Sequence, residues 1–261
     1  MSIYMIRDGI FGDSFEVKLI MALAAILACL YDYTKNKRYD YFWVFLFGTL
    51  VWTIVEIVLQ VIGTRVYEQA YLLGMELPIS FSALLQGTSE GAAVAILGVF
   101  IGDRLMNKAT RKKAVVIFTA VTGAMVLLSL LNANAEKNIG GDVLSRRDMF
   151  TAESILFIAV MSLIAIVWFW RALPYERKRG LYMYLSMAAY AIFWTIGEVF
   201  SNTRWIEVGG DGVYQRASLP VEIFALSYDI FIEIALIYVP FLAAPYFLNL
   251  IKVSKDNQVE S

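Results

Sequence analysis

Long apolar runs separated by short polar segments dominate this chain. A helix needs about 20 apolar residues to cross the hydrocarbon core of a bilayer, and seven runs reach that length. The pattern predicts an all-α polytopic membrane protein with seven transmembrane helices, forming one membrane domain over residues 1–261. The expected spans are residues 15–33, 41–63, 79–102, 114–133, 150–171, 182–203 and 220–248, followed by a short tail at 249–261.

The last apolar run differs from the others because it contains Pro240 and Pro245. A proline inside a helix removes a backbone N–H donor and clashes with the preceding turn. We therefore expect the seventh helix to kink or break near its C-terminal end.

The distribution of basic residues predicts the orientation. The loops after the first, third and fifth runs, together with the tail, carry 14 of the 22 lysines and arginines. Short cytoplasmic loops are enriched in these residues, so we expect the N-terminus outside and the C-terminal tail in the cytoplasm. The predicted location is a multi-pass position in the cell (plasma) membrane.

A short motif occurs twice, which predicts an internal repeat. Residues 52–56 read Trp-Thr-Ile-Val-Glu and residues 194–198 read Trp-Thr-Ile-Gly-Glu, 142 residues later. A Leu-Pro pair follows each copy at the same distance. Three spans (15–102), a linker helix (114–133) and three more spans (150–248) give a 3+1+3 parallel repeat. This plan is similar in architecture to that of the SWEET sugar transporters.

The composition excludes several classes of function. The net charge of −1 gives no electrostatic basis for nucleic-acid binding. The chain has no histidine and a single cysteine, Cys29, which removes histidine-ligated haem, the usual zinc sites and an intrachain disulfide. Seven spans with an external N-terminus resemble microbial rhodopsins, but the seventh run contains no lysine for a retinal Schiff base. We therefore predict no cofactor.

Five carboxylates lie inside the predicted spans, namely Glu56, Glu90, Glu198, Asp229 and Glu233. Ionised carboxylates are costly within a bilayer and usually mark a functional site. No lysine or arginine lies at a comparable depth in these runs, so we expect no basic partner. The acids would then be protonated, face a water-filled cavity or hold a cation.

Helical spacing places each acid on a polar stripe, because residues four apart share a helix face. Four predicted helices therefore turn polar faces toward one another. The candidate ion- or ligand-binding residues are Trp52, Glu56, Gln60, Gln86, Glu90, Trp194, Glu198, Asp229 and Glu233.

Three classes of function fit these residues. The first is transport or conduction of a cation or a small proton-coupled solute, with a proton shared by Glu56 and Glu198. The second is a membrane enzyme that uses protonated Glu56, Glu198 or Asp229 as a general acid on an isoprenoid or lipid, in a plan similar to that of the small fungal terpene cyclases. The third is a seven-helix receptor or assembly subunit. The expected partners are the lipid bilayer and a small molecule or cation, and an oligomer is compatible with the sequence.

Overall fold

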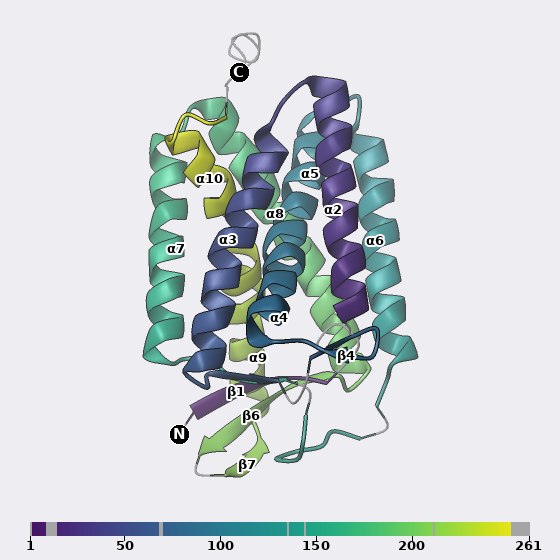
Figure 1. The fold of residues 1–261 in the computed structure, drawn as a ribbon, viewed down its shortest axis with the longest axis vertical. Coiled ribbons are helices and arrows are strands. Elements are labelled where there is room, and N and C mark those ends of the chain that lie inside the picture. Colours follow the sequence, from purple (N-terminus) through teal and green to yellow (C-terminus); the bar gives the residue numbers. More distant parts are fainter. Residues whose placement is uncertain are drawn as a thin grey trace.

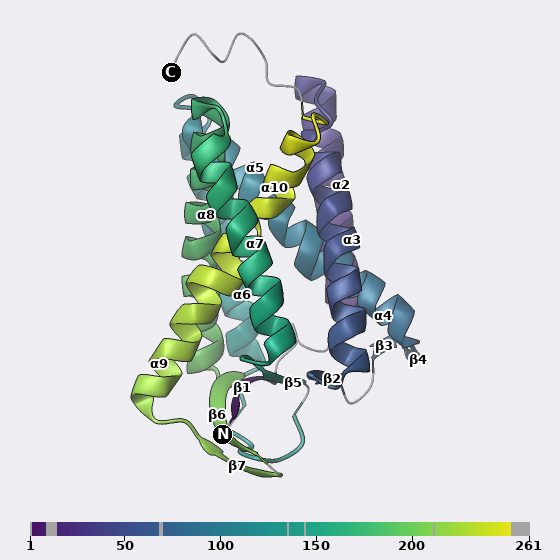
Figure 2. The same ribbon diagram turned by 90° about the vertical axis from the view of Figure 1, so that its left-hand side faces the viewer.

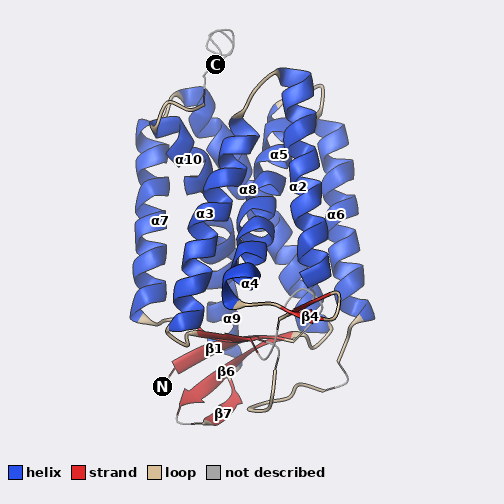
Figure 3. Cartoon of the chain, in the orientation of Figure 1, coloured by secondary structure: helices blue, strands red, loops and turns tan. Residues whose placement is uncertain are grey.

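The computed structural model describes residues 2–8, 15–67, 70–134, 136–143, 145–210 and 212–251. Helices account for 70% of it and form an upright bundle. A small antiparallel sheet covers one end of the bundle, and α10 lies toward the opposite end (Figures 1 and 3). We call these the sheet end and the tail end.

Six helices of the described residues are long and apolar enough to cross a membrane, which makes the chain a multi-pass integral membrane protein. They are α3 (Asp40–Val61), the composite helix α4–η1–α5 (Ile79–Gln86, Gly87–Ala93, Val94–Met106), α6 (Arg111–Leu131), α7 (Ala152–Arg171), α8 (Pro174–Phe200) and the composite helix α9–η2–α10 (Leu219–Tyr228, Asp229–Leu236, Val239–Phe247). The first predicted span is also a helix, α2 (Phe15–Asn36), but it is not among the six.

Helix α8 begins earlier than the apolar pattern predicts. Its first turn holds Pro174 and Glu176, eight residues before the expected start at 182. Proline is favoured in the first helical turn, where its missing N–H has no intrahelical partner in any case. The polar turn that looked like a loop therefore extends the helix and brings Arg179 into the bundle, where it is buried.

Both composite helices contain a π-helical segment. Segment η1 begins at Gly87 and η2 begins at Asp229, a separation of 142 residues. Such segments widen the helix locally and are frequent at functional sites. After η2 a turn at Ile237 and Tyr238 interrupts the helix, and Pro240 lies in the first turn of α10. The predicted break of the seventh helix is therefore confirmed.

The polar segments at the sheet end form strands that the sequence pattern did not predict. Five strands of the described residues pair in the order β2-β5-β1-β6-β7, and all four pairings are antiparallel. They are β1 (Ser2–Arg7), β2 (Arg65–Tyr67), β5 (Ser145–Asp148), β6 (Arg204–Gly210) and β7 (Val213–Arg216). A separate hairpin joins β3 (Tyr71–Leu72) to β4 (Met75–Glu76). Strands β6 and β7 form a hairpin, whereas β1, β2 and β5 pair with strands that are far away in the sequence.

The helices fall into two groups joined by α6. We call α2, α3 and α4–η1–α5 half 1, and α7, α8 and α9–η2–α10 half 2. In each half the π segment packs against the first two helices of its own half. The segment after each π segment packs against the other half, because α5 contacts α8 and α10 contacts α3. The two composite helices therefore cross in the middle of the bundle (Figure 2).

Candidate functional site

Four arginines project from one face of the sheet. Arg7 lies directly opposite Arg204 in the β1–β6 pair, and Arg65 lies directly opposite Arg147 in the β2–β5 pair. Arg147 also lies opposite Met5, two residues from Arg7. Because directly opposed residues share a face and side chains alternate along a strand, all four side chains share one face. Their ion pairs with carboxylates of the helices show that this face points into the bundle.

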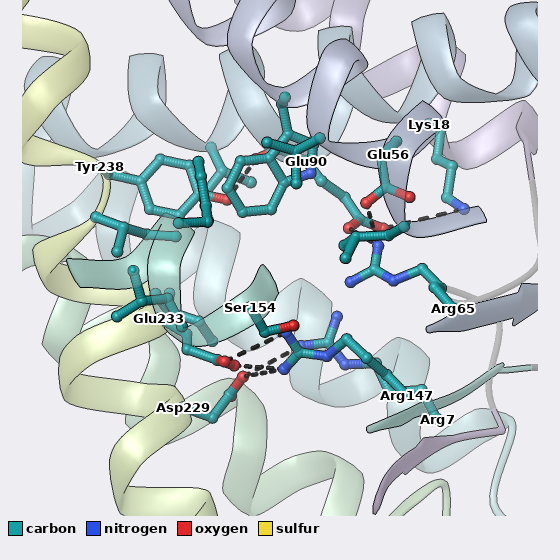
Figure 4. Close-up of a pocket in the computed structure, with 18 of the residues that line it drawn as sticks. Arg7, Lys18, Glu56, Arg65, Glu90, Arg147, Ser154, Asp229, Glu233 and Tyr238 are labelled. Carbon is teal, nitrogen blue, oxygen red and sulfur yellow. Dashed lines mark hydrogen bonds and ion pairs between the residues drawn. The ribbon is translucent and has the colours of Figure 1, made fainter. Parts of the chain in front are cut away.

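A cavity lies beneath this face, with a volume of about 80 Å³. Four cationic and four anionic side chains line it, together with an apolar wall. The charged residues are Arg7, Lys18, Arg65, Arg147, Glu56, Glu90, Asp229 and Glu233. Figure 4 shows Glu56, Glu90, Lys18 and Arg65 on one side of the space and Glu233, Asp229, Arg147, Arg7 and Ser154 on the other.

Half 1 contributes the first group of charges. Glu56 of α3 is fully buried, and its Oε1 accepts a short hydrogen bond from Arg65 at the start of β2. Glu90 of η1 has looser ion pairs, 3.8 Å to Arg65 and 4.0 Å to Lys18 of α2. The Glu90 side chain keeps 17% of its surface exposed. The two carboxylates therefore differ, because one is locked to an arginine and the other remains accessible from the cavity.

Half 2 contributes the second group. Arg147 is bonded to Glu233 and lies 3.7 Å from Asp229. Arg204 is fully buried and bonds Asp229, the carboxylate of Glu198 at 3.1 Å and the hydroxyl of Thr195 at 2.8 Å. Arg204 thus links the second helix of this half to its π segment. It is the counterpart of Arg65 in half 1, since each lies at the start of the strand after the second helix.

The expectation that the intramembrane acids have no basic partner is wrong. Arginines from the strands and Lys18 near the start of α2 reach all five carboxylates. An arginine side chain is long enough to carry its charge well beyond its own backbone. Loops that look extramembrane in the sequence can therefore neutralise charges that lie deep in the helices.

The structure brings together most of the residues that the sequence selected. Trp52, Glu56, Glu90, Trp194, Asp229 and Glu233 all line the cavity. Glu198 lies behind this lining and joins the network through Arg204. Gln60 and Gln86 are outside the lining, and Gln86 is fully buried elsewhere in the helix packing. Sequence reasoning missed Arg7, Arg65 and Arg147, because strand pairing is not visible in a hydrophobic pattern. It also missed Lys18, which lies in the first turn of α2.

The apolar wall of the cavity is partly aromatic. The indole of Trp52 stacks on Tyr238 with ring centroids 5.6 Å apart, and Phe157 meets Trp52 edge-on at 6.2 Å. The Tyr238 hydroxyl donates a 2.5 Å hydrogen bond to the backbone carbonyl of Glu90 in η1. This bond ties the turn after η2 to the π segment of the other half, at the point where the two composite helices cross.

The two arginines of β1 and β6 have pKa values that move in opposite directions. Burial acts to lower the pKa of Arg7, but the carboxylates of Asp229, Glu198 and Glu90 outweigh it and raise that pKa. Burial dominates for Arg204 and lowers its pKa, although Asp229 opposes the shift. An arginine side chain stays protonated in proteins, so both guanidinium groups contribute a full positive charge to the cavity region.

Two charged groups of the cavity are weakly bonded. Within the described part of the chain, the Arg7 guanidinium donates no hydrogen bond, and its closest carboxylate is Asp229 at 3.9 Å. Over the same residues, the side chain of Glu90 accepts no hydrogen bond and has only its two long ion pairs. A guanidinium has five N–H donors, and a carboxylate has about four lone-pair sites. These groups therefore have capacity for a ligand.

A second ion cluster lies at the tail end. Arg179 of α8 donates bonds of 2.7 and 2.9 Å to Asp103 of α5, and one of 2.8 Å to Asp40 of α3. Tyr41 adds a 3.0 Å bond to Asp103. This cluster ties both halves together on the side of the crossing away from the cavity. The sequence offered little signal for it, because its acids lie at the polar ends of helices, where charges are ordinary.

The chain was compared with known proteins, and no family model, curated protein or solved structure matches it. Nor do the described residues contain a group of three or more histidine, cysteine, aspartate or glutamate side chains arranged to hold a metal ion. The geometry of the cavity is therefore the basis for assigning a function.

Proposed function

We propose that this protein transports a small proton-coupled solute, and that the cavity at the sheet end is its binding site. The proposal includes seven spans in a 3+1+3 parallel repeat, an external N-terminus and a plasma-membrane location. The observation that carries it is the position of the cavity between two halves that each face it with a carboxylate–arginine cluster. Binding sites between related halves are a recurring feature of secondary transporters.

Three correspondences support the repeat. The π segments begin 142 residues apart, as do the two copies of the Trp-Thr-Ile-X-Glu motif. Arg7 on β1, before the first helix of half 1, lies opposite Arg204 on β6, after the second helix of half 2. In the same way, Arg147 on β5, before the first helix of half 2, lies opposite Arg65 on β2, after the second helix of half 1. The packing of α5 on α8 is matched by that of α10 on α3. A pseudo-two-fold axis relates all three.

The charges favour a solute over a bare metal cation. Four cationic side chains already balance the four acids of the lining, so there is little net negative charge to attract a cation. A proton shared by Glu56 and Glu198 also lacks geometric support, because each carboxylate is bonded to its own arginine. Glu90 is the better proton site, since it is the most exposed of the four acids of the lining and it accepts no hydrogen bond within the described residues.

Transport requires the cavity to open alternately to the two sides. In this conformation the Arg179 cluster holds the two halves together at the tail end. Opening that side means separating Arg179 from Asp103 and Asp40. Met183 lies one turn farther along α8, is fully buried, and packs its backbone against Gly102 of α5. Met183 should become accessible only when the tail end opens.

Cysteine accessibility tests this requirement without knowledge of the solute. The only native cysteine, Cys29, is replaced by alanine. Single cysteines are then introduced as Ser154→Cys in the cavity lining and Met183→Cys beneath the tail-end cluster. Oriented proteoliposomes are treated from either side with a membrane-impermeant methanethiosulfonate. Exposed Lys178→Cys reports the tail side as a positive control.

We expect Ser154→Cys to react from the sheet side and Met183→Cys to react slowly from the tail side. A solute that favours one conformation should raise the labelling rate of one of these two cysteines and lower that of the other. If Met183→Cys never reacts while Lys178→Cys reacts fully, the tail end does not open and transport is excluded.

A second candidate, an enzyme acting on a lipophilic substrate, is favoured by the aromatic wall of Trp52, Tyr238 and Phe157. Aromatic faces can stabilise a cationic intermediate. In that case Glu90 is the best-placed acid, because Glu56 and Asp229 are each hydrogen-bonded to an arginine. Mass spectrometry of lipids extracted from the purified protein tests this candidate, which predicts a retained isoprenoid or lipid.

A further inference from the structure

We propose that the ligand of the cavity is a small carboxylate with an apolar body, that Arg7 binds its carboxylate group, and that Glu90 takes up a proton on binding. This inference rests on the proposed function, because it takes the cavity as the binding site. It goes further by naming the chemical class of the solute and the two residues that recognise it.

Arg7 is suited to bind an anionic group. Its guanidinium lines the cavity, stacks over the ring of Trp194 at 5.3 Å, and donates no hydrogen bond to any described residue. The stacking and the attraction to Asp229 hold the group in place and leave its N–H donors available. Arginine binds carboxylates through two parallel hydrogen bonds. The other arginines of the lining already donate to Glu56 and Glu233.

Glu90 faces the same space with a carboxylate that accepts no hydrogen bond from the described residues. The groups around it come from six other parts of the fold. They are Lys18 of α2, Glu56 of α3, Arg65 of β2, Arg7 of β1, Tyr238 before α10 and Tyr190 of α8. Two of these groups, Lys18 and Arg65, are cations that lie within 4.0 Å of the Glu90 carboxylate.

Charge balance then couples the anion to a proton. The lining holds equal numbers of cationic and anionic side chains. A bound carboxylate adds one negative charge in a partly desolvated space and raises the cost of keeping Glu90 ionised. Protonation of Glu90 restores neutrality. The site would therefore carry one anion and one proton together, without net charge.

The remaining lining sets the shape of the ligand body. Apolar side chains from several helices, among them Met21, Val94, Met125 and Ile158, line the cavity with the Trp52–Tyr238 stack. The ligand body would therefore lie against an apolar wall while its charged group meets the ionic side chains. A short fatty acid fits this combination, and hexanoate is the probe we choose.

Titration calorimetry of the purified protein in nanodiscs tests the inference. Hexanoate is titrated near neutral pH in two buffers with different ionisation enthalpies, so that proton uptake is measured together with affinity. We expect saturable binding with uptake of about one proton per site. Hexanamide, which has the same shape without the charge, should bind at least roughly tenfold more weakly.

Two variants assign the roles. Arg7→Gln should lose roughly tenfold or more in hexanoate affinity and keep its melting temperature, because Arg7 donates no hydrogen bond within the described residues. Arg146→Gln is the matched control. Arg146 lies on the opposite face of the same sheet and pairs with Glu207, so its loss should leave hexanoate affinity unchanged. Glu90→Gln should bind hexanoate without proton uptake.

Three results would overturn the inference. They are equal binding of hexanoate and hexanamide, an Arg7→Gln variant with wild-type affinity, and tighter binding of the zwitterion norleucine without proton uptake. None of them bears on the cysteine-accessibility experiment. The cavity can thus be shown to alternate between the two sides even if its ligand is of another class.

Discussion

The protein has two buried ion clusters, one at each end of the bundle, and they differ in how fully they are bonded. At the tail end Arg179 uses three of its donors on Asp103 and Asp40. At the sheet end Arg7 and Glu90 face a cavity without a hydrogen bond from the described residues. A fully bonded polar network fixes one arrangement of helices, whereas a partly bonded one retains capacity for a ligand. We infer that the tail-end cluster is a closure and the sheet-end cluster a binding site.

The largest effect is expected from Arg179→Gln. The substitution leaves the carboxylates of Asp40 and Asp103 without their main partner in a buried place, which costs about 3–5 kcal/mol of stability. Unfolding by SDS titration in mixed micelles measures the loss. Lys178→Gln, one residue away and exposed, should change the free energy of unfolding by less than about 0.5 kcal/mol.

Arg179→Lys keeps the protein measurable if the glutamine variant does not fold. Lysine preserves the charge but not the two-pronged contact with Asp103, so its loss should be smaller and should loosen the tail end. Wild-type stability in both variants would show that the tail-end cluster is not a closure.

A smaller effect is expected from Gly91→Ala, which alters the shape of the sheet-end site without changing its charge. A Cβ atom there would lie 2.6 Å from the backbone oxygen of Gly48 and 2.4 Å from Cβ of Trp52. Segment η1 must move away from α3, at a cost of about 1–3 kcal/mol. The same SDS titration measures this cost, and tryptophan fluorescence reports the displacement of Trp52.

Gly123→Ala is the matched control in α6, because a Cβ at Gly123 meets no atom within 4 Å. It should change stability by about 1 kcal/mol or less. If the two alanine variants behave alike, the close contact between η1 and α3 does not shape the cavity.

The sequence predicted the helices well because burial in lipid imposes a simple length and composition rule. It also selected Glu56, Glu90, Asp229 and Glu233, since an acid inside an apolar run has a high cost. It missed Arg7, Arg65, Arg147 and Arg204 as their partners. Their positions depend on pairing between strands that are far apart in the sequence, and no local pattern encodes such pairing.

Two other errors have local causes. Gln60 and Gln86 share a helix face with an acid by spacing alone, yet neither lines the cavity. The π segment that begins at Gly87 interrupts the regular helical spacing between Gln86 and Glu90. The start of α8 was placed too late because its first turns are charged, and those turns carry Arg179.

The central claim is that the two halves move apart at the tail end, and an electron–electron distance measurement tests it most directly. Spin labels are attached at the exposed positions Lys108→Cys, after α5, and Lys178→Cys, on α8, in the Cys29→Ala background. We expect two populations of spin–spin distance. The fraction of molecules with the longer distance should change when hexanoate is added or the pH is lowered. A single narrow distance under every condition would contradict it.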